Sequence, residues 1–242
     1  MGVFTQYFES RFPTIAPDLR GYGKNRATAP FVMEQHLDDL IALLDQQGIS
    51  QVIILGWSLG GILAMELALR YPDRVQGLIL VATAARPWSD HPRVSGLDLL
   101  WTAIAGMINV IRPGWRWNIR HLGSRSLFRY LVAQQTPEVY RYLAREAAYA
   151  YWKTSRFADR ALMARMHQGY NRVPDLVQIT CPALMLIGAE DRHIAPAASR
   201  ETAKALPNCE WEEFETTAHL LPWEMPELVL RRIDRWLEEH RF

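Results

Sequence analysis

The chain has 242 residues, of which 49% are hydrophobic and 22% are charged, and its formal net charge is +1. A chain of this length can bury one sizeable core, and this composition excludes an intrinsically disordered protein. We therefore expect one globular domain with an insertion. The sequence contains no nucleic-acid-binding motif, so we expect no nucleic-acid partner.

Charge is unevenly distributed along the chain. Residues 86–175 contain 14 Arg or Lys and 6 Asp or Glu, a net charge of +8, whereas the remainder contains 13 and 20, a net charge of −7. One interpretation is that these arginines solvate the outer faces of helices. The alternative is that they attract an acidic substrate, an acidic carrier or a membrane surface.

The termini and the cysteines favour a cytoplasmic protein. Residues 1–12 lack a basic region followed by a long apolar run, so we expect no signal peptide. The most apolar stretch, Leu97 to Ile111, contains Asp98 and is shorter than the roughly 20 residues that span a bilayer. Cys181 and Cys209 have neither a CxxC partner nor metal-ligand spacing, so we expect reduced thiols and no metal site.

The first part of the chain alternates between strand and helix patterns. Phe12–Pro17 is a short apolar run before the glycine-rich turn at residues 20–23, which predicts a strand that ends in a loop. Residues 31–47 have helical spacing, and Gly48 is placed where a helix would stop. Gln51–Gly56 is apolar and β-branched, which is typical of a buried parallel strand.

The same alternation continues to the C-terminus. Ile62–Tyr71 has the composition of a packed helix, and strands are predicted at Val75–Thr83, Pro182–Gly188 and Glu210–Phe214. Pro226–His240 is a closing amphipathic helix. This order predicts an α/β fold with a mostly parallel sheet flanked by helices.

A long helical insertion, residues 86–176, separates two of these strands. We expect it to form a lid over a core made of residues 1–85 and 177–242. Its aromatic residues form the core of the lid or line an apolar pocket beneath it. They are Trp88, Trp101, Trp115, Trp117, Phe128, Tyr130, Tyr149, Tyr151 and Trp152.

The segment from Gly56 to Gly60 matches G-x-S-x-G, with Ser58 at its centre. This motif places a nucleophilic serine in a strained turn between a strand and a helix, which is the context predicted here. A Cβ at either glycine is expected to clash as the chain reverses. The N-terminus of the following helix favours an oxyanion beside the serine. The alternative to a nucleophile is a structural turn in which the serine takes no part in chemistry.

A nucleophilic serine needs a base and a third group that orients the base. His219 follows the predicted last strand and precedes the last helix, whereas the other histidines considered lie in a helix, near the lid or at the terminus: His36, His91, His121, His167 and His240. Asp191 follows the strand at 182–188, at the edge where parallel sheets carry their chemistry. Glu190 and Asp90 are the alternative acids.

From Pro13 onward the chain resembles the α/β-hydrolase family. The turn around Ser58, called the nucleophile elbow in that family, is similar to those of carboxylesterases and haloperoxidase-like perhydrolases. The resemblance rests on the motifs APDLRGYG, GWSLGG, and GAEDRHIAP paired with TAHLLPWEMPE. It implies that His219 takes the proton of Ser58, that Asp191 orients His219, and that the Leu59 backbone N–H supplies one oxyanion donor. Serine instead of aspartate at the elbow argues against dehalogenases and epoxide hydrolases, which leaves acyl chemistry.

The resemblance also exposes a departure. Family members have two or three strands and a His-Gly loop before the segment that here begins at Phe4, and that loop supplies the second oxyanion donor. The third strand would lie between the strands predicted at 12–17 and 51–56. Because buried unpaired strand edges are costly, we expect a chain shortened at its N-terminus, with direct pairing of the two strands as the alternative.

These patterns predict a serine hydrolase that cleaves an ester or related acyl bond without a cofactor. We expect the partner to be a small-molecule acyl substrate. If the arginines of residues 86–175 attract a substrate, that substrate is acidic or carrier-bound. Its pocket is expected to include Trp57, Trp88, Trp101 and Leu220. The alternatives are an impaired fragment or binding protein with an incomplete oxyanion hole, and a perhydrolase or acyltransferase that uses peroxide or an alcohol instead of water.

Overall fold

The computed structural model describes residues 2–242, without the side chains of residues 147 and 149–151. Four strands form one sheet: β1 (Val52–Trp57), β2 (Val75–Val81), β3 (Ala183–Gly188) and β4 (Cys209–Phe214). The α-helices are α1 (Gly2–Phe8), α2 (Glu34–Gln46), α3 (Leu59–Arg70), α4 (Gly96–Ile111), α5 (Arg116–His121), α6 (Phe128–Leu131), α7 (Pro137–Tyr142), α8 (Ala148–Lys153), α9 (Arg156–His167), α10 (Pro196–Ala205), α11 (Leu221–Glu224) and α12 (Pro226–Glu239). Shorter helical turns are η1 (Pro72–Arg74), η2 (Gly123–Arg125), η3 (Leu143–Ala147) and η4 (Val173–Gln178).

The sheet is parallel throughout, in the order β1-β2-β3-β4. The predicted strand pattern from residue 51 onward is confirmed to within two residues at most ends. Parallel strands need helical crossovers, which α3 and α10 supply, while the helices α4 to α9 occupy the long connection between β2 and β3.

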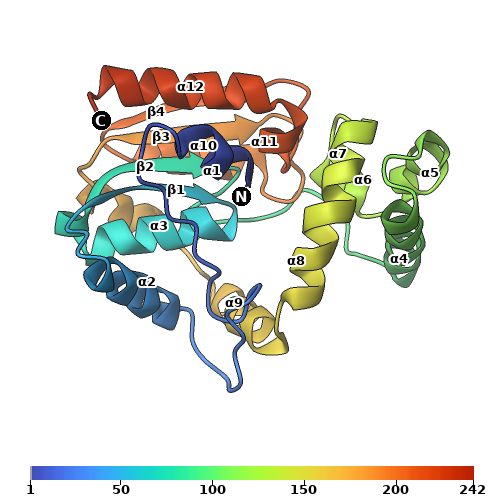
Figure 1. Ribbon diagram of the computed structural model, residues 1–242, viewed down its shortest axis with the longest axis horizontal. Coiled ribbons are helices and arrows are strands. Elements are labelled where there is room, and N and C mark those ends of the chain that lie inside the picture. Colours follow the sequence, from blue (N-terminus) through green and yellow to red (C-terminus); the bar gives the residue numbers. More distant parts are fainter. Residues whose placement is uncertain (1) are drawn as a thin grey trace.

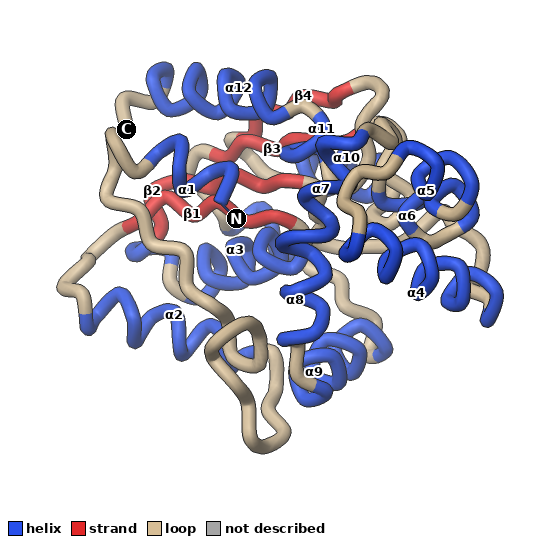
Figure 2. Tube along the Cα trace, turned by 45° about the vertical axis from the view of Figure 1, so that its right-hand side comes forward, coloured by secondary structure: helices blue, strands red, loops and turns tan. Residues whose placement is uncertain are grey.

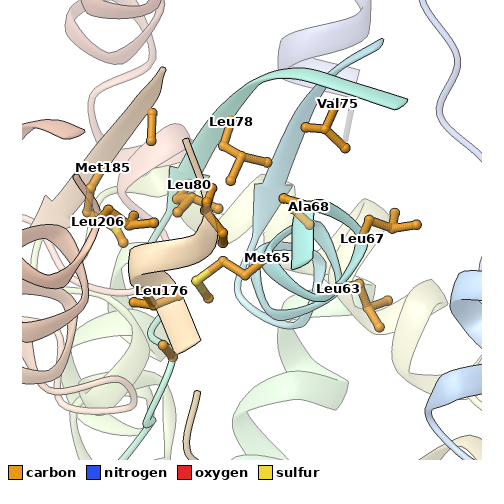
Figure 3. Packing of buried hydrophobic residues seen from close by; sticks show 14 of the residues in the cluster. Leu63, Met65, Leu67, Ala68, Val75, Leu78, Leu80, Leu176, Met185 and Leu206 are labelled. Carbon is orange, nitrogen blue, oxygen red and sulfur yellow. The ribbon is translucent and has the colours of Figure 1, made fainter. Parts of the chain in front are cut away.

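Alternate strand residues pack against helices on opposite faces of the sheet. Leu78 and Leu80 of β2 belong to the cluster that includes α2, α3 and η4 (Figure 3). Ile79 and Val81 belong to the cluster formed with α1 and α12. Figure 1 shows α12 and α3 on opposite sides of the sheet. This two-sided burial explains why β2 is almost entirely apolar.

The prediction of a strand at Phe12–Pro17 was wrong. Among the described residues this segment is irregular and largely exposed, and β1 is an edge strand with β2 as its neighbour. The segment does not pair with the free edge of β1, so the alternative of direct pairing between the two predicted strands was wrong as well. Helix α1 was not predicted, although Phe4 and Phe8 are buried against the sheet.

The connection between β2 and β3 is helical, as expected, and α4 to α8 lie beside the sheet instead of on its faces (Figures 1 and 2). Its aromatic residues differ in burial: Tyr130 is buried, whereas Trp117 and Trp152 are exposed. The side chains of Tyr149 and Tyr151 lie outside the described part. Within the described residues, no helix is long and apolar enough to cross a membrane.

The two cysteines are free thiols that pack at the margin of the core. Burial raises the pKa of the Cys209 thiol to about 12 and also raises that of Cys181. Thiols that hold their protons at neutral pH are poor nucleophiles and poor metal ligands.

Candidate active site

Ser58 occupies the sharp turn between β1 and α3. Its backbone has φ 53° and ψ −119°, a strained conformation for a residue with a side chain. Its N–H donates to the Val81 carbonyl at 2.9 Å, and its carbonyl accepts hydrogen bonds from Gly61 N–H at 2.9 Å and the Thr83 hydroxyl at 2.8 Å. These bonds to the neighbouring strand and its loop hold the turn in place.

The glycines around Ser58 have unequal roles. A Cβ on Gly56 would lie 2.3 Å from the Gly60 carbonyl oxygen, and one on Gly61 would lie 2.3 Å from the Thr83 side chain. A Cβ on Gly60 would meet nothing within 4 Å. The expectation of a clash therefore holds at Gly56 and was wrong at Gly60, because the tight approach falls one residue later.

Three side chains form a continuous chain of hydrogen-bonding distances. Nε2 of His219 lies 3.0 Å from Oγ of Ser58, and Nδ1 lies 2.8 Å from Oδ2 of Asp191. Asp191 and His219 are only 2% and 4% exposed, whereas Ser58 is partly exposed. The structure thus brings together, from three separate loops, the three residues that the sequence predicts as a triad.

The loops after β3 and β4 are joined by backbone contacts. Ala189 N–H donates to the Phe214 carbonyl at 3.1 Å, and Glu190 N–H donates to the Thr217 carbonyl at 2.8 Å. Gly188 permits this approach, because a Cβ there would lie 2.3 Å from the Ala218 carbonyl oxygen. The adjoining loops place Asp191 beside the ring of His219.

The second oxygen of Asp191 is fixed by its own loop. Oδ1 accepts hydrogen bonds from the N–H groups of His193 at 2.8 Å and Ile194 at 2.9 Å. The alternative acids Glu190 and Asp90 are exposed, and neither bonds to His219 in the part of the chain that the structure describes. The geometry therefore favours Asp191 as the partner of His219.

The residues predicted to line a pocket are dispersed. Trp57 donates from Nε1 to the His219 carbonyl at 2.9 Å, and its ring lies 5.2 Å from the His219 ring. Leu220 is buried in the cluster that joins the insertion to Trp57. The Trp88 carbonyl accepts a hydrogen bond from the N–H of Ala195, in the segment after Asp191. Trp101 lies on α4, and its ring is 5.8 Å from the Arg125 guanidinium.

Leu59 begins α3 directly after Ser58. The first N–H groups of a helix have no acceptor within the helix, and they carry its positive partial charge. The geometry is therefore compatible with the expected role of the Leu59 N–H as an oxyanion donor. Within the described residues, no group of three or more His, Cys, Asp or Glu could hold a metal ion.

Sequence reasoning missed His193, which lies in the loop beside the triad. Its ring lies 4.7 Å from that of His219, edge to face, and 6.4 Å from the parallel ring of His91. Desolvation, followed by the nearby His219, lowers the pKa of His193 to about 4, although the residue keeps exposed surface. A neutral second imidazole therefore borders the site, and its position two residues after Asp191 is the signal that could have found it.

Sequence reasoning also missed Glu224, which is 9% exposed. Its carboxylate accepts hydrogen bonds from the N–H groups of Ala218 at 2.9 Å, Ala133 at 2.8 Å and Gln134 at 2.6 Å. Burial raises its pKa, and the backbone hydrogen bonds oppose this effect. An acidic residue inside the apolar segment after His219 was the available signal.

Comparisons with known proteins agree with this architecture. A model of the alpha/beta hydrolase family matches residues 2–232. The pimeloyl-[acyl-carrier protein] methyl ester esterase of Neisseria meningitidis is 28% identical over 209 residues, which cover 86% of this chain and 62% of the relative. Lipase LipV of Mycobacterium tuberculosis is 43% identical over 72 residues, 30% of this chain and 28% of the lipase.

A solved structure gives the same result. A thermophilic esterase from Thermogutta terrifontis superposes with a TM-score of 0.70 at 26% identity, covering 99% of this chain and 85% of that one. The chain spans less than two thirds of the length of the two relatives named above. The family match nevertheless covers nearly all of it, and the chain belongs to the α/β-hydrolase family.

Proposed function

We propose that this protein is a serine hydrolase that cleaves an ester or related acyl bond through an acyl-enzyme on Ser58. The observation that carries the proposal is the unbroken chain from Ser58 through His219 to Asp191, at 3.0 Å and 2.8 Å. The strained turn and the start of α3 support it, because they expose a serine beside free backbone donors. The relatives named as esterases and a lipase support it independently.

In the proposed reaction, Nε2 of His219 accepts the hydroxyl proton while Oγ of Ser58 attacks the acyl carbonyl. The Leu59 N–H stabilises the resulting oxyanion. Collapse breaks the bond to the alcohol, which takes the proton from His219 as it leaves. Water then repeats the sequence on the acyl-enzyme and releases the acid, while Asp191 holds the His219 tautomer and stabilises the imidazolium.

We propose that residues 86–176 act as a lid on a core of residues 1–85 and 177–242. The insertion contacts the segment that follows His219, since Leu220 N–H donates to the Leu131 carbonyl at 3.0 Å. The ring of Tyr142 stacks on Trp223, with centroids 4.2 Å apart. A movement of the insertion would therefore displace the loop that carries His219, as expected of a lid that shapes the substrate pocket.

The substrate that we propose is an acyl ester, either small or carrier-bound. The N. meningitidis relative is named for a methyl ester of pimeloyl-acyl-carrier protein. Trp57 is only partly buried and its ring lies 5.2 Å from that of His219, so it supplies apolar surface for an acyl chain. The triad acts on the ester group itself, so a chromogenic ester is a sufficient probe of the proposed chemistry.

Hydrolysis of p-nitrophenyl butyrate tests this function. Ser58→Ala and His219→Ala are each expected to reduce turnover about 10⁶-fold, or to the uncatalysed background. The matched control is Ser124→Ala, because Ser124 is an exposed serine of the insertion. Equal rates in the unmodified protein and in Ser58→Ala would contradict the proposal.

A further inference from the structure

Helix α4 presents an apolar face to solvent. Ile111 is 79% exposed, Leu97 is 67% exposed and Met107 is 61% exposed. Leu100 falls on the same stripe, because these four residues follow one another at spacings of three, seven and four. Figures 1 and 2 both place α4 and α5 at the outer edge of the molecule, away from the sheet. We call this stripe the α4 face.

The α4 face belongs to a well-formed helix. Ser95 caps α4 in a reciprocal capping box with Asp98, and Ala105 and Asn109 are buried on its inner side. The only charged residue of the helix, Asp98, is paired with Arg129 at 2.7 Å. The exposed side therefore carries no charge, whereas a helix that only faces water is polar on its outer side.

Unpaired cations border one end of the α4 face. Arg112, Arg116 and Arg120 are exposed, and none of them forms an ion pair with the residues that the structure describes. The rings of Trp115 and Trp117 stack at 5.1 Å in the same region, and the Arg112 guanidinium lies 4.7 Å from the Trp115 centroid. The arginines and tryptophans thus lie together where α4 ends and α5 begins.

We propose that the α4 face, with its border of arginines and tryptophans, docks on an anionic lipid surface. Exposed aliphatic side chains enter the boundary between headgroups and acyl chains, tryptophans favour that boundary, and arginines pair with lipid phosphates. The positive charge complements an anionic membrane, which explains why these arginines form no ion pair with the described residues. This inference concerns the location of the protein and does not depend on Ser58.

Sedimentation with vesicles tests the proposal. The full chain is expected to bind vesicles of phosphatidylglycerol and phosphatidylcholine at low salt and to bind pure phosphatidylcholine more weakly. Met107→Asp and Ile111→Asp are each expected to lower the partition coefficient about tenfold or more. Arg116→Gln and Arg120→Gln are expected to lower it about fivefold each, on the anionic vesicles alone.

The matched control is Val177→Asp, because Val177 is 66% exposed and lies outside the α4 face. It is expected to bind vesicles like the unmodified protein, as is Ser58→Ala. Absence of vesicle binding by the unmodified chain would overturn the proposal. If the protein binds no vesicles and light scattering shows a dimer that Ile111→Asp converts to a monomer, the α4 face is instead a contact between two copies.

Discussion

The carboxylate of Glu224 accepts a hydrogen bond from the backbone N–H of Ala218 at 2.9 Å, one residue before His219. Its other oxygen accepts hydrogen bonds from Ala133 and Gln134 in the insertion. One buried side chain therefore fixes the insertion and the histidine loop relative to each other. The position of the base in the proposed triad depends on a residue that contacts neither Ser58 nor Asp191 in the described hydrogen bonds.

Replacing Glu224 by Gln should destabilise the protein and weaken catalysis. The amide offers one acceptor oxygen, and its NH₂ group would face backbone donors, so at least one buried N–H would lose its partner. The free energy of unfolding in urea should fall by about 1–3 kcal/mol, and kcat for an ester should fall with it. Glu227→Gln is the control, because Glu227 is exposed on α12. A variant of Glu224 with unchanged stability and kcat would contradict the role of this carboxylate.

Asp191→Asn should lower kcat about 10⁴-fold. The amide lacks the negative charge that stabilises the imidazolium, and its NH₂ group favours the wrong tautomer of His219. The fold should survive, since the remaining carbonyl oxygen can accept from His193 and Ile194. Steady-state ester hydrolysis measures the effect. Glu190→Gln and Asp90→Asn are the matched controls and should keep nearly full activity. A larger loss in either control would reassign the acid.

The three glycines of the elbow should respond differently to alanine. Gly56→Ala and Gly61→Ala introduce contacts at 2.3 Å and should unfold or strongly destabilise the protein. Gly60→Ala has open space within α3 and should raise the free energy of unfolding by up to about 1 kcal/mol. Thermal unfolding of the three variants tests this order, and equal losses at all three positions would contradict it.

His193 should make stability depend on pH. Its pKa is about 4 in the folded protein and near 6.5 when unfolded, so only the unfolded chain binds this proton between those values. The contribution of His193 to stability is therefore present above pH 6.5 and is lost as the pH falls toward 4. Urea unfolding across this window should show a smaller loss for His193→Gln than for the unmodified protein. Parallel curves of stability against pH for the two proteins would contradict this role of His193. His167→Gln is the control, because His167 is an exposed histidine.

Local patterns sufficed where burial is two-sided or a motif forces the backbone. The runs that became β2 and β3 were recognisable because strands buried on both faces are apolar almost throughout, and the turn at Ser58 because few sequences tolerate it. The segment 12–17 was equally apolar, yet a strand requires a neighbour, which no local pattern reveals. The sequence positions of His193 and Glu224 were visible signals, but the contacts of the two side chains form only after the loops have packed.

The most direct test of the proposed catalytic role of Ser58 is covalent labelling by a fluorophosphonate probe, located by mass spectrometry of the digested protein. The account predicts a single adduct on Ser58, lost in Ser58→Ala, slowed in His219→Ala and retained in Ser124→Ala. A folded protein that carries no adduct on Ser58, or that is labelled equally fast when His219 is removed, would contradict the account.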